Sequence, residues 1–333
     1  MIDDNIISII ENIKMGIRYL NKYLLSKCTK KSIDTIHIKQ MKNKTIVVDA
    51  SIYLYKFIGE DTFVESLYLM ITTFMRYNIK LIFVFDGKPP PEKWQTIIDR
   101  NTAKSTAEKT YKELQDIIND DDYDDNDKVK MKIQLETIKK QCIRIRKYHI
   151  DRAKEIMNCF GVKYIDATGE ADEICAKMCI SGLAYGCLSD DMDMMTYGCP
   201  IILRNLNLLK QTIMIYNYEN ILDELQMSYN IMKELLILST NDYLKNNDNN
   251  FIETMKWYNQ YKIKSEDISF KEWLLKNTKY LSNNPSINNL EEIYNLDDCL
   301  DVKIKNILLS RVNNKLDKKE IKNVLKEEGF IFI

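Results

Sequence analysis

The chain has 333 residues, 45% of them hydrophobic, and a net charge of −1, so it can bury a full core but has no overall basic signature. Eight cysteines without a CxxC pair and only two histidines argue against a zinc site and fit a reducing compartment. The acidic start is unlike a signal peptide, and no apolar run approaches the ~18 residues of a membrane span. We therefore expect a soluble intracellular protein, nuclear or at a cytoplasmic site.

The predicted elements alternate between helices and strands along the chain. Apolar residues at helical spacing predict helices over 2–25, 50–57 and 63–77. Short apolar runs predict strands over 45–49, 81–86, 162–166, 184–189, 200–204 and 212–216, and the run 235–238 is also strand-like. The rest of the chain after 217 has a helical pattern. This alternation predicts an α/β fold with a mostly parallel sheet.

Residues 93–160 contain neither glycine nor proline and predict two long helices. The acidic run at 120–127 splits them and is interpreted as a solvated connection. The second helix is strongly basic between Lys139 and Lys154. Such a face is either solvated or, beside an acidic crevice, a surface for nucleic acid.

Carboxylates follow several of the strand-like runs at the point where each run ends, and others begin a helix at 170. The acids are Asp49, Asp86, Glu170, Asp172, Asp191, Asp193 and Asp242. The carboxyl ends of parallel strands meet in one crevice, where so many acids would repel each other without cations. A pair of Mg²⁺ ions is the simplest source of cations, and phosphodiester chemistry is its usual work. The alternative is a set of acids that cap helices. Asp190 and Glu173 point differently along their segments and are left out.

Short motifs between residues 15 and 243 resemble those of the flap endonuclease (XPG-type) 5′ nuclease family. They are Met15–Leu20, Val48–Ser51 with Tyr55 and Phe57, Val84–Pro90 with Lys93 and Arg100, Glu170–Glu173, Asp191–Asp193 with Thr196–Gly198, and Asn241–Tyr243. One such motif is weak, but all of them occur in order and at compatible spacing.

The resemblance implies a PIN-like, Rossmann-type core with a helical arch inserted into it. On this basis the chain divides into an N-terminal helical extension (1–14), two parts of a nuclease core (15–92 and 161–243), a helical arch or clamp (93–160) and a helical C-terminal region with an altered helix–turn–helix element (244–333).

The resemblance also implies the activity: Mg²⁺-dependent hydrolysis of a DNA phosphodiester near the junction of a 5′ flap, with 5′→3′ exonuclease activity, in replication, repair or recombination. The expected partners are DNA flaps, nicks and single-strand/duplex junctions, bound by a monomer, with Mn²⁺ able to replace Mg²⁺. The first metal region would be held by Asp49, Asp86, Glu170 and Asp172. Asp191, Asp193 and Asp242 would complete the second.

Further residues acquire roles only through the resemblance. Lys93 and Arg100, two helical turns apart, would reach the scissile phosphate; otherwise they are two exposed helix cations. Tyr55 would stack on a base; otherwise it is a core tyrosine. The other expected nucleic-acid contacts are Gly16, Lys88, Lys104, Arg144, Arg146 and Lys147.

The chain also departs from the family. Fourteen residues precede Met15, the stretch from Asp49 to Asp86 is short, and 245–250 lacks the glycines of a duplex-binding hairpin. No sliding-clamp peptide is found at the end of the chain. We interpret these departures as a divergent branch, with a viral source as one hypothesis. Two other functions stay open: a 5′→3′ exonuclease acting on RNA, and a scaffold that binds nucleic acid without cleaving it.

Overall fold

The structure is a computed structural model that describes residues 16–118, 125–239, 250–264, 268–281, 294, 296 and 318–330. Its centre is a seven-stranded sheet in the order β1-β7-β6-β5-β2-β3-β4. The strands are β1 Ile33–His37, β2 Thr45–Asp49, β3 Lys80–Phe85, β4 Lys163–Asp166, β5 Gly186–Leu188, β6 Ile201–Asn207 and β7 Thr212–Asn217. Strands β2 to β6 are parallel, while β7 runs antiparallel to β6 and β1. The predicted α/β class with a mostly parallel sheet is confirmed. Strand β1 was not predicted.

The central strands are buried on both faces. In β2, Ile46 and Val48 belong to one half of the core and Val47 to the other. In β3, Phe83 and Ile82 are divided in the same way. Burial on both sides explains why these strands appear in the sequence as continuous apolar runs without alternation.

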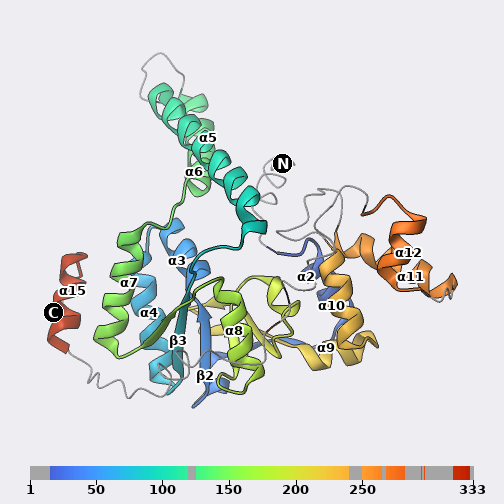
Figure 1. Ribbon diagram of the computed structural model, residues 1–333. Coiled ribbons are helices and arrows are strands. Elements are labelled where there is room, and N and C mark those ends of the chain that lie inside the picture. The colour runs from blue at the N-terminus through green and yellow to red at the C-terminus, as the bar shows by residue number, and fades with distance from the viewer. Residues whose placement is uncertain are drawn as a thin grey trace.

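Helices cover both faces of the sheet (Figure 1). One face is covered by α3 Ala50–Gly59, α4 Phe63–Arg76 and α7 Lys147–Phe160. The other is covered by α8 Ala171–Ile180, with α2 Leu20–Lys27, α9 Tyr218–Leu225 and α10 Tyr229–Leu238 beside it. The carboxyl ends of the strands therefore open between two helical layers.

A hairpin of two long helices projects away from this core (Figure 1). After the short helix η2 Pro91–Lys93, α5 Trp94–Ile118 leads outward and α6 Asp125–Gln141 leads back, packed against α5. Ala107 is the one α5 side chain that is buried among those described. A helix this polar is stabilised by its hairpin partner and by solvent, because it has no apolar face to bury.

The prediction of only two helices over 93–160 is wrong, because residues 142–146 are not helical and α7 begins anew at Lys147. The backbone N–H of Arg146 donates to Nδ1 of His149 at 2.9 Å, which helps to start the new helix. Unlike α6, α7 buries an apolar face that includes Ile156 and Met157. The basic residues of 139–154 consequently lie on three segments and do not form one helix face.

The strand-like reading of 235–238 is also wrong, since this run is the last turn of α10. Met232, Leu235 and Leu236 are buried at the i, i+3, i+4 spacing of a helix, and the Ser228 hydroxyl accepts the N–H of Ile231 as an N-cap. A short apolar run cannot by itself distinguish a buried strand from a buried helix segment.

Among the residues that the structure describes, the remaining α-helices are α11 Phe251–Lys264 and α12 Phe270–Asn277 at one side of the molecule and α15 Lys318–Glu327 at the other (Figure 1). The expected extension at 1–14, Asp242 and most of the segment 245–250 lie outside the described residues. In the parts of the chain that are described, no helix is long and apolar enough to cross a membrane.

Candidate active site

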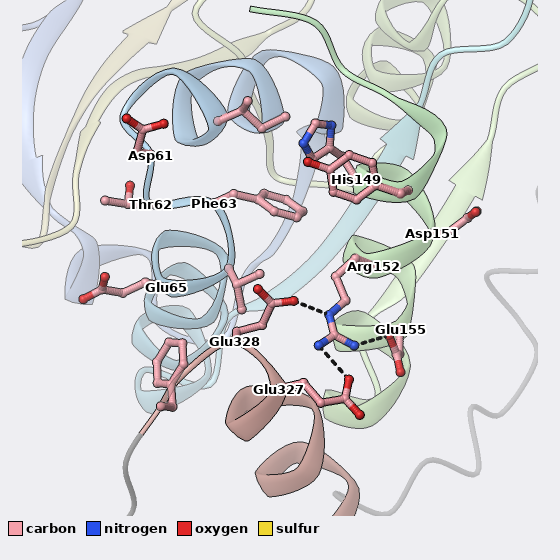
Figure 2. A pocket seen from close by; sticks show the side chains of 14 residues that line it. Asp61, Thr62, Phe63, Glu65, His149, Asp151, Arg152, Glu155, Glu327 and Glu328 are labelled. Carbon is pink, nitrogen blue, oxygen red and sulfur yellow. Dashed lines mark hydrogen bonds and ion pairs between the residues drawn. The ribbon is translucent and has the colours of Figure 1, made fainter.

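One pocket, of about 970 Å³, lies between α4, α7 and α15 (Figure 2). At its wall, Arg152 binds the carboxylates of Glu155, Glu327 and Glu328 at 2.7–3.0 Å. Further acids line the same pocket, including Asp61 and Glu65. Because three carboxylates already hold Arg152, this pocket is ill suited to bind a phosphate group.

A second pocket, of about 330 Å³, lies at the carboxyl ends of β2, β3 and β5. Strands β2 and β5 are neighbours, and the chain leaves β2 toward β3 but leaves β5 toward β6, in the opposite direction; open α/β sheets form ligand sites at such a point. The lining includes five of the predicted acids, two predicted cations and a predicted aromatic residue: Asp49, Asp86, Glu170, Asp172, Asp191, Lys93, Arg100 and Tyr55.

Asp49 is the last residue of β2 and is held firmly at the start of α3. Its Oδ1 accepts the N–H groups of Ser51 (3.1 Å) and Ile52 (3.4 Å), and its Oδ2 accepts the hydroxyl of Ser189 (3.2 Å). Burial, followed by repulsion from the Asp86 and Asp191 carboxylates, raises the pKa of Asp49 to about 8. Asp49 therefore caps α3, but the negative charge of its buried carboxylate is left uncompensated, and a bound cation would neutralise it.

Asp86 follows β3 and is fixed against the start of α8, because its Oδ1 accepts the N–H of Ala171 at 2.8 Å. The backbone of Gly87 donates to the carbonyl of Gly169 at 2.7 Å. A Cβ at position 87 would collide with the carbonyl oxygen of Ala167, so only glycine allows this approach. The segments that follow β3 and β4 are thus hydrogen-bonded to each other, which places Asp86 beside Glu170 and Asp172.

Asp172 provides the clearest test of whether a cation fits. Its Oδ1 is buried, and none of the described groups hydrogen-bonds to it. Burial, and then the charges of Asp49 and Asp191, raise its pKa well above the ordinary value. An orphaned carboxylate oxygen among other carboxylates is the donor set that hard divalent cations such as Mg²⁺ prefer.

The carboxylates are not drawn together as they would be around an ion. Within the described ranges, no three histidine, cysteine, aspartate or glutamate side chains form a group that could hold a metal. Lys93 accounts for part of this, because its Nζ lies 2.7 Å from Oε1 and 2.8 Å from Oε2 of Glu170. Arg100, farther along α5, lines the same pocket. The donor types fit divalent cations, and Lys93 neutralises one of the acids.

Asp191 and Asp193 follow β5, and the backbone of Gly16 lies against their carboxylates. Asp191 caps the short helix η3 Met192–Met195 by accepting the N–H of Asp193 at 2.9 Å. Gly16 has a φ of +80°, and a Cβ there would lie 2.5 Å from Oδ1 of Asp191 and 3.3 Å from Oδ1 of Asp193. Only glycine lets the backbone lie so close to these carboxylates. Asp193 is buried behind Asp191 and does not line the pocket.

The predicted nucleic-acid residues are distributed around this pocket. Tyr55 lines it and belongs to neither half of the core, and the Lys104 ammonium lies 5.0 Å from the centre of its ring. Burial, followed by repulsion from Arg144 and Arg100, lowers the pKa of Lys104. Arg144 is paired with Glu108 at 2.7 Å. Three others are exposed, Lys88 before α5 and Arg146 and Lys147 at the start of α7.

Sequence reasoning missed Ser189, whose hydroxyl donates to Asp49 and accepts the N–H of Asp191 at 3.2 Å. The only sign of Ser189 in the sequence is a small polar residue at the end of an apolar run.

The two acids that the sequence analysis left out of the predicted site have structural partners. The carboxylate of Asp190 accepts the N–H of Asn205 at 2.7 Å, and Glu173 pairs with Lys177 one helical turn away.

Comparisons with known proteins identify the fold and the family. Flap endonuclease 1 of Glycine max is 30% identical over 248 residues, which cover 69% of this chain and 62% of that protein. The catalytic core of Rad2 in complex with a DNA substrate superposes with a TM-score of 0.57 at 22% identity, covering 95% of each chain. The Holliday junction-resolving enzyme GEN1 with product DNA and a Mg²⁺ ion gives a TM-score of 0.59 at 14% identity, covering 94% of this chain and 72% of that one. At these identities the structural likeness concerns the fold.

Two family models match the sequence. The XPG N-terminal domain matches residues 15–107 and the XPG I-region matches residues 161–242. Together they cover more than half of the chain, and between them they contain every described acid of the pocket. They leave most of the projecting hairpin and the chain after 242 unmatched. The chain belongs to the XPG/FEN-1 family of 5′ nucleases.

Proposed function

We propose that this chain is a metal-dependent, structure-specific 5′ nuclease that hydrolyses DNA phosphodiesters near the base of a 5′ flap and degrades DNA from 5′ ends. Flaps, nicks and single-strand/duplex junctions arise in replication, repair and recombination, and these are its proposed substrates. The 30% identity to the soybean enzyme fits a divergent member; a viral source stays a hypothesis.

One observation carries the proposal: five carboxylates and two cations line one pocket at the foot of a projecting helical hairpin. The acids would hold two Mg²⁺ ions, with Mn²⁺ able to substitute. Glu170, Asp172, Asp49 and Asp86 would serve the first ion, and Asp191, Asp193 and Asp242 the second. Bound Mg²⁺ supplies an activated water and positive charge against the scissile phosphate.

Lys93 at the end of η2 and Arg100 on α5 have the complementary role of holding the phosphate. Lys93 would leave Glu170 as the substrate enters and move its ammonium to the scissile phosphate. Arg100 lines the same pocket and can bind phosphate oxygens in a bidentate manner. Tyr55 offers a ring at the pocket wall on which a nearby base can stack. The exposed Lys88, Arg146 and Lys147 would contact the backbone farther away.

The test is digestion of end-labelled substrates by the full chain. A 5′-flap duplex, a nicked duplex and a single strand should be compared in Mg²⁺ and in excess chelator. We expect cleavage near the flap base that requires Mg²⁺. Equal cleavage in chelator would exclude the metal role. Matched RNA flaps distinguish the RNA alternative, and tight binding without any cleavage would support a scaffold.

A further inference from the structure

The first turn of α5 exposes two large apolar side chains to solvent. Trp94 is 59% exposed, and Ile98, one turn farther along, is 55% exposed. Among the described residues, the Trp94 ring has neither an aromatic partner nor a cation above it. Leaving an indole in water forgoes a large favourable burial term, so an exposed tryptophan beside a polar site indicates a surface that is covered when a ligand binds.

This apolar pair is confined to one place on the hairpin. Beyond it α5 is mainly polar, and a series of threonine hydroxyls bonds back to carbonyls one turn earlier, as Thr102 does to Ile98 and Thr106 does to Thr102. Trp94 directly follows Lys93, and both Ile97 and Arg100 from the next turn line the acidic pocket. Trp94 and Ile98 therefore lie at the rim of the site, where the hairpin joins the core.

The charges around this rim indicate what covers it. Lys93, directly before α5, is followed by Arg100 and Lys104 on α5, and Arg144 lies close enough to depress the pKa of Lys104. Two of the acids near these cations are held in ion pairs, Glu170 with Lys93 and Glu108 with Arg144. A ligand that presents an aromatic face to Trp94 and phosphates to the neighbouring cations is a nucleotide of a single strand.

We propose that Trp94, backed by Ile98, is a stacking platform for one nucleobase of the single-stranded segment that crosses the foot of α5. The platform would hold that nucleotide while its phosphates lie along the cationic side of the helix. This inference rests on the proposed function and adds a binding element to it. Because every base has a flat aromatic face, the platform would fix position without selecting sequence.

The experiment measures affinity by fluorescence anisotropy in Ca²⁺, where hydrolysis is suppressed. The probes are a 5′-flap duplex, the same duplex without a flap, and flaps with a single abasic unit at successive positions. For Trp94→Leu we expect the intact flap to bind about 5- to 100-fold more weakly, as for loss of one stacked base. Trp94→Phe should stay within about threefold, and the duplex without a flap should bind all three proteins alike.

The abasic series identifies the stacked nucleotide. In the wild-type protein one abasic position should weaken binding by a similar factor, and in Trp94→Leu the same position should have no further effect, because the two changes remove one contact. The indole emission should also be quenched by the intact flap, with Trp94→Phe reporting the background from Trp257 and Trp273. A matched control is Ile133→Ser on α6, whose side chain is 58% exposed, and it should bind normally.

Two results would overturn the platform: unchanged flap affinity in Trp94→Leu, or an abasic effect that persists in that variant. Equal loss of affinity for the duplex without a flap would instead assign Trp94 to general folding or duplex contact, which also contradicts the proposal. Cleavage by the wild-type protein in Mg²⁺, run in parallel, separates the two levels. If the wild-type protein cleaves the flap and Trp94→Leu binds it with unchanged affinity, only the stacking platform is excluded. If the wild-type protein neither binds nor cleaves flaps, both the platform and the proposed function are excluded.

Discussion

The central strands end at one edge of the sheet, the carboxyl edge, and begin at the opposite one, the amino edge. These two edges carry opposite charge and are built differently. At the carboxyl edge, Asp49 and Asp191 are buried and held by several hydrogen bonds. At the amino edge, Lys44 directly precedes β2, Lys80 begins the neighbouring β3, and both are exposed. Lys163 beside them has a pKa lowered by burial and then by the charge of Lys80. Strand β2 thus ends in fixed, desolvated charge and starts beside solvated charge, whereas Asp86 after β3 is exposed. Catalysis benefits from the first arrangement, because preorganised charge needs no reorganisation during reaction.

The largest expected effect comes from neutralising a fixed acid. We expect Asp191→Asn, which keeps an acceptor for the N–H of Asp193, to lower cleavage by on the order of 10³-fold or more. The matched control is Asp190→Asn, because the neighbouring carboxylate bonds to the backbone of Asn205 and does not line the pocket. Single-turnover rates with excess enzyme measure both. Near-normal cleavage by Asp191→Asn, with the protein still folded, would remove it from the metal site.

The next effect tests the cations that face these acids. Lys93→Ala and Arg100→Ala should each lower the single-turnover rate by about 10²- to 10³-fold and change flap affinity by only a few-fold, because their contact matters most in the transition state. Lys109 is an exposed lysine of α5, and the control variant Lys109→Ala should cleave at the wild-type rate. If both pocket variants matched Lys109→Ala, the two residues would be ordinary solvated cations.

A smaller effect concerns stability and pH. Asp49 has a folded pKa of about 8, above its unfolded value, so between roughly pH 4 and pH 8 the folded state binds more protons than the unfolded state. Without divalent ions the free energy of unfolding should therefore fall as pH rises through this range. Asp49→Asn, which can still cap α3, should flatten the slope. Urea unfolding in chelator at pH 5 and pH 8 measures it.

Mg²⁺ should oppose this loss at pH 8 by binding only the folded state. The midpoint of urea unfolding should rise with Mg²⁺ concentration in the wild-type protein and rise less in Asp49→Asn. A midpoint that ignores Mg²⁺ in the wild-type protein would contradict the assignment of the acidic pocket as the metal site.

The smallest expected effect is at the other edge. Lys44→Gln combined with Lys80→Gln should leave flap cleavage within about twofold and change the free energy of unfolding by less than about 0.5 kcal/mol, because exposed charges away from special features contribute little. A large loss of cleavage from this double variant would show that the two edges share one function.

The sequence by itself determined the pocket acids, their order and the sheet class. These features depend on local patterns, in which a continuous apolar run predicts a doubly buried strand and the residue after it lies at the carboxyl edge. Through the resemblance of Val84–Pro90 and its surroundings it also placed Lys93 and Arg100 beside those acids, although Lys93 ends η2 and only Arg100 lies on α5.

Only the tertiary structure decided which groups meet. It pairs Lys93 with Glu170, places Gly16 against Asp191, and makes Ser189 a bridge to Asp49. These partners are far apart in sequence or depend on a backbone turn, so no local pattern contains them. It also divided 93–160 after α6 and made 235–238 helical, because burial of α7 and α10 against the core outweighed the weak local signals.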